Sequence, residues 1–286
     1  MKVVSFVRNG KSSYGVVAGP DNDRGIVDVG ARLGAKYPDL VAVLKAGALK
    51  EVEAAAQGAA ADVKLDGTTL LPVVPNPGKI VCVGVNYDEH RREMGREPPG
   101  HPTIFVRFAE SQVAHGQPVI KPAESDKLDY EGELAVIIGK EGYKLSENEA
   151  LGIIAGYSCY MDGSVRDWQT HTSQFTPGKN FVATGGFGPW MVTAEEIPDP
   201  QDLMLETRLN GQVMQKSGTD LMTFNIRKII KYVTTWMPLK PGDVIATGTP
   251  GGVGTKRNPP VYMKDGDVVE VEISKVGLLR NPVKAA

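Results

Sequence analysis

Two glutamates, Glu131 and Glu133, stand in the apolar segment KLDYEGELAVIIGK. Apolar residues occupy every second position from 134 to 138, which predicts a buried strand whose other face carries both glutamates. Two like charges side by side in a core are costly unless something neutralises them. A hard divalent cation such as Mg²⁺ or Mn²⁺ does so, because it takes carboxylate oxygens and water as ligands. The spacing therefore predicts a metal site.

Asp162 offers a third carboxylate after another apolar stretch, in IIAGYSCYMDGSVRDWQ. Three carboxylates leave coordination positions open for water and a chelating substrate, as a catalytic metal requires. The competing interpretation places both glutamates on an exposed strand face and Asp162 at the cap of a turn. A Glu-x-Glu pair alone favours that interpretation, and its combination with the segments below favours the metal site.

A histidine and a glutamate lie three residues apart in GVNYDEHRREMG, which predicts a strand end followed by a short polar helix. His90 and Glu93 then share one helix face, where the carboxylate orients the imidazole as a general base for water. A helix this short is weak in isolation, so it suits a lid that orders over substrate. The alternative is a solvated helix with an incidental pair.

The glycine-rich segment TGTPGGVG, residues 247–254, predicts a loop whose backbone approaches a ligand closely. Its amides and hydroxyls, including those of Gly248 and Thr249, suit an anion. The following TKRNPP cannot open a helix, and no Gly-Lys-Ser/Thr ending is present, which excludes the dinucleotide and P-loop interpretations. An ordinary tight turn between strands is the alternative.

Further polar residues follow Asp162 in SVRDWQ and TPGKNF. Arg166, Gln169 and Lys179 are candidates to line the same site. A lysine near clustered carboxylates offsets their charge and binds an oxyanion. Lys179 on its own also fits a surface lysine.

The composition is that of a soluble globular protein of 286 residues, with 41% hydrophobic and 23% charged residues. A net charge of −2 does not indicate a basic surface that would bind nucleic acid. The N-terminus lacks a secretory core, and no apolar run is long enough to span a bilayer. We expect a cytoplasmic protein in which Cys82 and Cys159 are buried thiols.

The elements that must position these residues are mostly strands. Residues 1–75 predict a small β-rich domain, with strands in MKVVSFV, YGVVAG and GIVDVG separated by Gly, Asn and Asp turns, then helical character in DLVAVLKAGALKEVEAAAQGAA. Residues 76–286 predict a strand-rich second domain with helices in SENEALGIIAGYS and NIRKIIKYVTTWM. Helices do not alternate regularly with strands, which favours an α+β, mainly β fold over a doubly wound sheet.

Taken together, these segments resemble the fumarylacetoacetate hydrolase family. The resemblance runs from about residue 77 to about residue 275 and rests on eight segments in the family's order: GVNYDEHRREM, FVRFAESQVAHGQPVIKP, LDYEGELAVIIGK, YMDGSVRDWQ, PGKNF, NGQVMQKSGTDLMTF, LKPGDVIATGTPGGVG and DGDVVEVEI. It implies a mixed β-roll catalytic core, a small N-terminal domain, a homodimer, and Mg²⁺ or Mn²⁺ in the site.

The resemblance also assigns expected roles. The metal ligands would be Glu131, Glu133 and Asp162; the catalytic residues would be His90, Glu93 and Lys179; and the substrate-binding residues would be Gln169, Arg166, Thr249 and Gly248. Arg107 stands where many members have a lysine, and Gly163 where others have a larger residue. Arg107 and His115 are candidates to bind a second substrate carboxylate.

The implied activity is hydrolysis of the C–C bond of an acylpyruvate, such as maleylpyruvate or fumarylpyruvate, to pyruvate and an acid, in aromatic or sugar-acid catabolism. His90 and Glu93 favour this reaction because they supply a base for water. The same site suits oxaloacetate decarboxylation, or hydration or isomerisation of a 2-oxo-alkenoate. A keto-acid-binding relative without catalysis is the non-enzymatic alternative.

Overall fold

A computed structural model describes residues 1–20 and 24–286. Within them an eleven-stranded sheet runs in the order β4-β3-β2-β1-β13-β11-β10-β16-β5-β6, with β7 paired to β13. Its strands are β1 (Lys2–Arg8), β2 (Lys11–Ala18), β3 (Gly25–Asp28), β4 (Val63–Lys64), β5 (Ile80–Gly84), β6 (Thr103–Arg107), β7 (Gln112–Val113), β10 (Gly132–Ile138), β11 (Ile154–Met161), β13 (Gly185–Thr193) and β16 (Val244–Ala246).

A second sheet packs against the first and has the order β15-β14-β17-β18-β8. It comprises β8 (Val119–Lys121), β14 (Met204–Leu209), β15 (Gln212–Gly218), β17 (Val268–Ile273) and β18 (Gly277–Ala285), while β9 (Leu128–Asp129) pairs separately with β12 (Ser164–Val165). The expectation of a mainly β fold is therefore confirmed.

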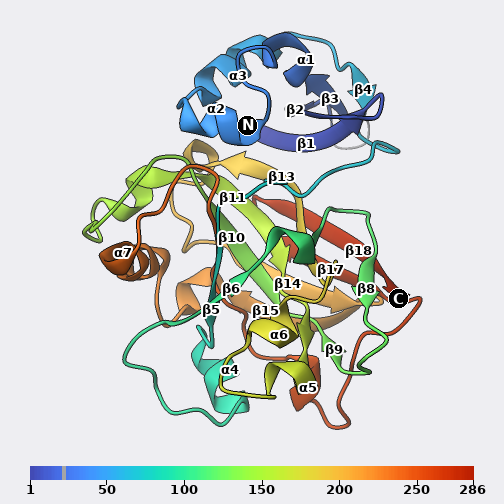
Figure 1. Ribbon diagram of the computed structural model, residues 1–286, viewed down its shortest axis with the longest axis vertical. Coiled ribbons are helices and arrows are strands. Elements are labelled where there is room, and N and C mark those ends of the chain that lie inside the picture. Colours follow the sequence, from blue (N-terminus) through green and yellow to red (C-terminus); the bar gives the residue numbers. More distant parts are fainter. Residues whose placement is uncertain (21–23) are drawn as a thin grey trace.

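The helices are short and lie around the sheets (Figure 1). They are α1 (Gly30–Leu33), α2 (Leu40–Lys45), α3 (Leu49–Ala56), α4 (Asp88–Glu93), α5 (Arg166–Gln169), α6 (Thr176–Lys179) and α7 (Ile226–Trp236), with 3₁₀ turns at 109–111, 150–153, 194–196, 219–221 and 254–256. None of the helices in the described ranges combines the length and apolar character needed to cross a membrane.

Helix α7 forms where the sequence predicts it. The Asn225 side chain caps its start by accepting a hydrogen bond of 2.9 Å from the Lys228 amide. Ile226, Ile229 and Val233 recur at helical spacing and are buried. The segment at 39–60 is also helical, but it forms two helices, since Gly47 adopts a φ of +64° between them.

The helix expected in SENEALGIIAGYS is wrong. The chain makes a single 3₁₀ turn at 150–153 and then strand β11, which is buried along its whole length between β10 and β13. The Ser146–Glu149 pair does form, with Glu149 accepting hydrogen bonds from the amide (2.9 Å) and hydroxyl (2.7 Å) of Ser146. A short apolar run buried on both faces suits a strand as well as a helix, and the neighbouring strands decide between them here.

The N-terminal elements gather at one end of the molecule, and α4, α5 and α6 gather at the other (Figure 1). Strand β1 joins the N-terminal strands to the main sheet by pairing with β13 through Lys2↔Val192 and Val3↔Met191. The turn expected between the second and third strands falls partly outside the described residues. The domain boundary at residue 75 stays a prediction.

Strand β10 lies between two hydrophobic cores. Leu134, Val136 and Ile138 belong to a core that also includes β14 and β17 residues. Ala135 and Ile137 face a second core shared with α2 and α3. Both faces of the strand are thus withdrawn from water, including the face that carries Glu133.

Candidate functional site

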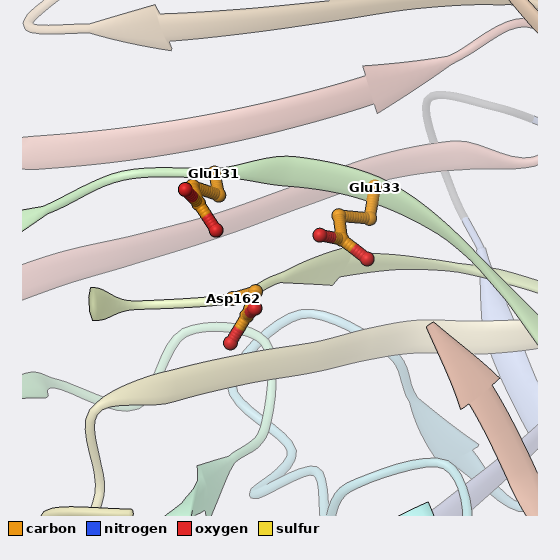
Figure 2. A group of neighbouring side chains, drawn as sticks. All are labelled: Glu131, Glu133 and Asp162. Carbon is orange, nitrogen blue, oxygen red and sulfur yellow. The ribbon is translucent and has the colours of Figure 1, made fainter. Parts of the chain in front are cut away.

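The three predicted carboxylates converge on one buried point. Glu131 immediately precedes β10, Glu133 lies in it, and Asp162 follows the paired strand β11. The Asp162 amide donates to the Glu131 carbonyl at 2.8 Å, which fixes the register. One oxygen from each carboxylate lies within 4.8 Å of the others, and all three residues are buried (Figure 2). The strand pairing therefore assembles a set of hard oxygen ligands.

Gly132 stands between the two glutamates because the second sheet approaches very closely there. A Cβ at this position would lie 2.0 Å from Oγ1 of Thr207 in β14. The absence of a side chain lets the two sheets pack tightly behind the site. It also leaves the opposite face of the segment to the two glutamates.

Lys179 supplies a buried positive charge at the carboxylates. Its Nζ lies 2.6 Å from Oε2 of Glu131, from Oδ2 of Asp162 and from Oγ of Ser164. An ammonium has three donors, so these contacts use all of them. Burial lowers the pKa of Lys179, but the charges of Asp162 and Glu131 outweigh burial and leave that pKa raised. Lys179 is thus a charged partner of the acidic cluster.

Glu133 carries the charge that the protein neutralises least. Burial, together with the nearby Asp162 and Glu131, raises its pKa well above the ordinary value. Burial also raises the pKa of Glu131, but Arg166 and Lys179 outweigh it, so that pKa is lowered. Within the described ranges Glu133 makes no ion pair and accepts one hydrogen bond, of 2.8 Å, from the Gly248 amide. A divalent cation fits this site because it neutralises Glu133 and shares oxygens of the other two carboxylates.

Asp129 is a central residue of the site that the sequence analysis missed. Its fully buried carboxylate accepts hydrogen bonds from Nε of Arg166 (2.8 Å) and from the amides of Gly254 (2.8 Å), Thr255 (2.9 Å) and Tyr130 (2.8 Å). It therefore connects the glycine-rich loop to Arg166. A second acid just before the Glu-x-Glu pair, in LDYEGE, was the available signal.

Arg166 in turn reaches the carboxylates and the neighbouring amide. Its Nη2 lies 2.7 Å from Oε1 of Glu131, and its Nη1 donates to Oε1 of Gln169 at 3.0 Å. Arg166 and Gln169 are the first and last residues of the one-turn helix α5. The two residues expected to bind substrate therefore act on each other and on a proposed metal ligand.

The expected dyad forms on the predicted helix. His90 is buried, and its Nδ1 lies 3.2 Å from Oε2 of Glu93. Glu93 also accepts a hydrogen bond of 3.1 Å from the Gly252 amide, which fastens α4 to the glycine-rich loop. Upstream, the buried Asn86 side chain bonds to the Phe224 and Thr247 backbones. The α4 segment is thus held over the carboxylates from both sides.

The glycine-rich loop presents backbone groups to the site. The Thr249 hydroxyl donates to the Gly132 carbonyl (2.9 Å) and accepts from Gln215 (2.8 Å), so its proton is already committed. The Thr249 amide has no acceptor among the described residues. If Thr249 binds a carboxylate, the free donor is its backbone N–H.

A small cavity of about 30 Å³ opens beside the carboxylates. Seven of the predicted site residues line it: His90, Glu131, Glu133, Arg166, Gln169, Lys179 and Thr249. Asp162, Glu93 and Gly248 touch these residues but do not line the cavity. The volume corresponds to about two water positions, which is less room than a keto-acid substrate needs.

The two candidates for a second carboxylate lie elsewhere. Arg107 is buried behind the cluster, where it pairs with Asp162 and donates to the Gly163 carbonyl (2.9 Å) and the Thr184 hydroxyl (3.0 Å). A Cβ at Gly163 would lie 1.8 Å from the Thr184 carbonyl oxygen, so glycine is required there. His115 accepts from the Arg280 amide at 3.1 Å and lines a separate cavity.

Comparison with known proteins agrees with this architecture. The family model described as "Fumarylacetoacetate (FAA) hydrolase C-terminal" matches residues 79–284. The mitochondrial oxaloacetate tautomerase fahd2 of Xenopus laevis is 42% identical over 217 residues, which span 75% of this chain and 68% of the relative.

Solved structures that match the whole length of the chain include the following two. Fumarylacetoacetate hydrolase from Exiguobacterium antarcticum has a TM-score of 0.83 and 35% identity, with all of both chains covered. Maleylpyruvate hydrolase from Sphingobium sp. SYK-6, in complex with manganese(II) ion and pyruvate, has a TM-score of 0.82 and 30% identity, again with full coverage of both chains.

Proposed function

Because the chain belongs to the fumarylacetoacetate hydrolase family, we propose that it is a divalent-metal-dependent hydrolase of acylpyruvates. The substrate is a 2,4-diketo acid. Water adds to the distal carbonyl, the C–C bond next to that carbonyl breaks, and the products are pyruvate and a carboxylic acid. The observation that carries this proposal is the His90–Glu93 dyad, whose histidine lines the same small cavity as Glu131 and Glu133.

Glu131, Glu133 and Asp162 would hold the metal. Support comes from their three converging oxygens, from the raised pKa of Glu133, which has no cationic partner among the described residues, and from the manganese-containing structure of the maleylpyruvate hydrolase. Mg²⁺ and Mn²⁺ both suit an all-oxygen set of ligands. When bound, the cation supplies Lewis-acid stabilisation of the negative charge that develops on the pyruvate half of the substrate.

The dyad supplies the base for the attacking water. Glu93 accepts from Nδ1 of His90, which fixes the ring and leaves Nε2 as the proton acceptor. A water on Nε2 gives up its proton as it adds to the distal carbonyl. After the C–C bond breaks, the protonated imidazole is the acid that can return the proton to the leaving carbon.

The remaining residues bind and orient the substrate. The guanidinium of Arg166 and the amide of Gln169 line the cavity and point to recognition of oxygen atoms. Thr249 offers its backbone N–H to the carboxylate of the keto acid. Lys179 and the Gly248 amide hold the metal-binding carboxylates in place, because their donors are already taken by Glu131, Asp162 and Glu133.

A second candidate is a reaction of oxaloacetate. The 42% identity to an oxaloacetate tautomerase favours it. Tautomerisation moves one proton between carbon and oxygen, and His90 could carry that proton. Decarboxylation of oxaloacetate and isomerisation or hydration of a 2-oxo-alkenoate use the same grouping of residues. A relative that binds keto acids without catalysis is the remaining alternative.

The test is pyruvate release by the metal-loaded protein from a panel of acylpyruvates and oxaloacetate, with a chelator control. Spectroscopy of the enol form of oxaloacetate follows tautomerisation in parallel. Chelator-sensitive release of pyruvate and one equivalent of acid from an acylpyruvate supports the hydrolase. Turnover of oxaloacetate alone would replace it with the second candidate. If none of these acids is turned over, the 2-oxo-alkenoate hydratase and isomerase reactions are tested next, and a binding protein without catalysis becomes the stronger alternative.

The variant His90→Asn examines the base directly. Hydrolysis should fall by about a hundredfold or more, the usual contribution of a positioned general base. The matched control is His101→Asn, since His101 is exposed and stacks on Tyr232 in the same stretch of chain. Undiminished hydrolysis in His90→Asn would remove the dyad from the mechanism. The homodimer, the cytoplasmic location and a role in aromatic catabolism stay predictions.

A further inference from the structure

Arg96 lies at the point where the small cavity meets a larger one. The inner cavity, beside Glu131 and Glu133, measures about 30 Å³. An outer cavity of about 530 Å³ lies next to it, and Val85, Met94 and Arg96 line both. A substrate held by its keto-acid end at the carboxylates therefore extends past these three residues on its way out.

The charge of Arg96 is uncommitted, unlike that of the other cations on this segment. Nη2 of Arg91 and Nη2 of Arg92 lie 2.8 and 2.6 Å from the Asp88 carboxylate. His90 pairs with Glu93. No carboxylate within the described residues lies within 4.0 Å of the Arg96 guanidinium, which instead sits 5.9 Å from the Phe175 ring centroid. Arg96 thus keeps its donors free for a ligand.

The backbone of Arg96 is nevertheless held in place. Its amide donates to the Arg91 carbonyl at 3.0 Å, and Nη1 of Arg91 donates back to the Arg96 carbonyl at 2.6 Å. Arg91 is itself anchored by Asp88. The cation is therefore presented from a turn just after α4 that these hydrogen bonds fix, which reduces the ordering that binding requires.

The walls between the two cavities are apolar. Val85 and Met94 form the neck, and Phe105 and Phe175 line the inner side. The site therefore offers cations and the proposed metal ligands at its inner end, apolar contacts in the middle and a free guanidinium at its outer end. Glu97 lines the outer cavity but not the inner one, so it leaves Arg96 as the charged group at the neck.

From this arrangement we propose that Arg96 binds the distal carboxylate of a 2-oxo dicarboxylic acid whose keto-acid end lies at the carboxylate cluster. The guanidinium fork matches a carboxylate with two parallel hydrogen bonds. The inference rests on the proposed keto-acid site but not on hydrolysis, because binding of the distal carboxylate requires no bond to break. Arg96 thus replaces Arg107 and His115 as the candidate that binds the second carboxylate of the substrate.

The decisive measurement is binding of two 2-oxo acids of equal chain length to the Mg²⁺-loaded protein by calorimetry. One, 2-oxoadipate, ends in a carboxylate, and the other, 2-oxohexanoate, ends in a methyl group. The protein should prefer 2-oxoadipate by about tenfold or more, as one charge-assisted contact predicts. Arg96→Gln should abolish that preference and leave 2-oxohexanoate unchanged, while Arg96→Lys should keep part of it.

Arg92→Gln is the matched control, because Arg92 lies in the neighbouring helix α4, is exposed, and lines neither cavity. It should bind both acids as the unaltered protein does. Equal affinity of the unaltered protein for both acids, or an Arg96→Gln preference identical to that of the unaltered protein, would overturn the assignment. If the protein prefers 2-oxoadipate as expected but hydrolyses no acylpyruvate, the proposed hydrolase activity is wrong and the proposed Arg96 contact is still supported.

Discussion

Oδ2 of Asp129 accepts a hydrogen bond of 2.8 Å from Nε of Arg166. The same carboxylate accepts the amides of Gly254 and Thr255, and Arg166 reaches Glu131 at 2.7 Å. One buried carboxylate therefore holds in position both the glycine-rich loop and the arginine that contacts a proposed metal ligand. Asp129 does not line the cavity, so it acts through Arg166 and is a positioning residue.

Replacing Asp129 with asparagine should loosen this arrangement without changing its size. The asparagine NH2 group is a hydrogen-bond donor. Wherever it replaces a carboxylate oxygen, Arg166 or the loop amides lose their acceptor and face another donor. Leaving such buried groups unpaired costs about 1–3 kcal/mol of unfolding free energy. Arg166 also loses the acceptor that orients it, so KM for the keto acid should rise even under conditions in which the variant is fully folded. Asp126→Asn is the control, since Asp126 is 96% exposed and pairs with Lys121. A variant at Asp129 with unaltered KM would contradict the positioning role.

Glu133→Gln should weaken metal binding selectively. The amide keeps the shape of the side chain and can still accept from Gly248, but it cannot neutralise a cation. Added Mn²⁺ should raise the melting temperature of the unaltered protein, since a ligand that is present at about a hundred times its Kd stabilises by about 2.7 kcal/mol. Glu133→Gln should respond much less, while Glu141→Gln, on the exposed surface, should respond fully. An equal response in all three proteins would exclude Glu133 as a ligand.

Much of this site could be anticipated because its signals are local. Glu131 immediately precedes β10 and Glu133 lies in it, and His90 and Glu93 share one helix turn, so spacing alone places each pair. The role of Asp129 could not be anticipated, because Gly254 and Thr255 lie 125 and 126 residues away from it along the chain. Arg107 looked available for a substrate, but its ion pair with Asp162 spans 55 residues. Such pairings follow from the folded strands and not from the local pattern.

The elements of the fold likewise divide into those that local sequence patterns predict and those that depend on distant parts of the chain. The sequence correctly predicted strands such as β1, β2 and β10, and a helix in NIRKIIKYVTTWM, which forms α7. Strand β11 was mistaken for a helix because its residues are apolar on both faces, so no period distinguishes the two structures. Its identity comes from β10 and β13, which supply hydrogen bonds on both sides.

Lys179→Met should destabilise the metal-free protein. Lys179 is 1% exposed, and removing its charge leaves the Glu131 and Asp162 carboxylates buried without their shared partner. Breaking a buried ion pair in this way costs about 3–5 kcal/mol. Mn²⁺ should restore part of the loss, because the cation then neutralises the same oxygens. Chemical denaturation with and without Mn²⁺ measures both effects, and Lys284→Met provides an exposed control. Unchanged metal-free stability in Lys179→Met would show that the ammonium does not offset the cluster.

Asp28 should give the N-terminal elements a stability that depends on acidity. The residue is 2% exposed and accepts hydrogen bonds from Ser13 (2.5 Å), Arg8 (2.8 Å) and the Ala31 amide (2.9 Å). Burial alone raises the pKa of Asp28, but these donors outweigh it and the pKa is lowered in the folded protein. A folded-state pKa below the unfolded value, about 3.9, means that ionised Asp28 stabilises the fold above that pH.

At neutral pH, Asp28→Asn should therefore unfold at a lower urea concentration than the unaltered protein. Its free energy of unfolding should be lower by about 1–3 kcal/mol. The difference should shrink as the pH falls below about 4 and through the lowered pKa of Asp28, because the unaltered carboxyl then becomes protonated too. Urea unfolding at several pH values measures this, with the exposed Asp66→Asn as control. A gap between the two proteins that is constant across the whole range would mean that the hydrogen bonds do not depend on the charge of Asp28.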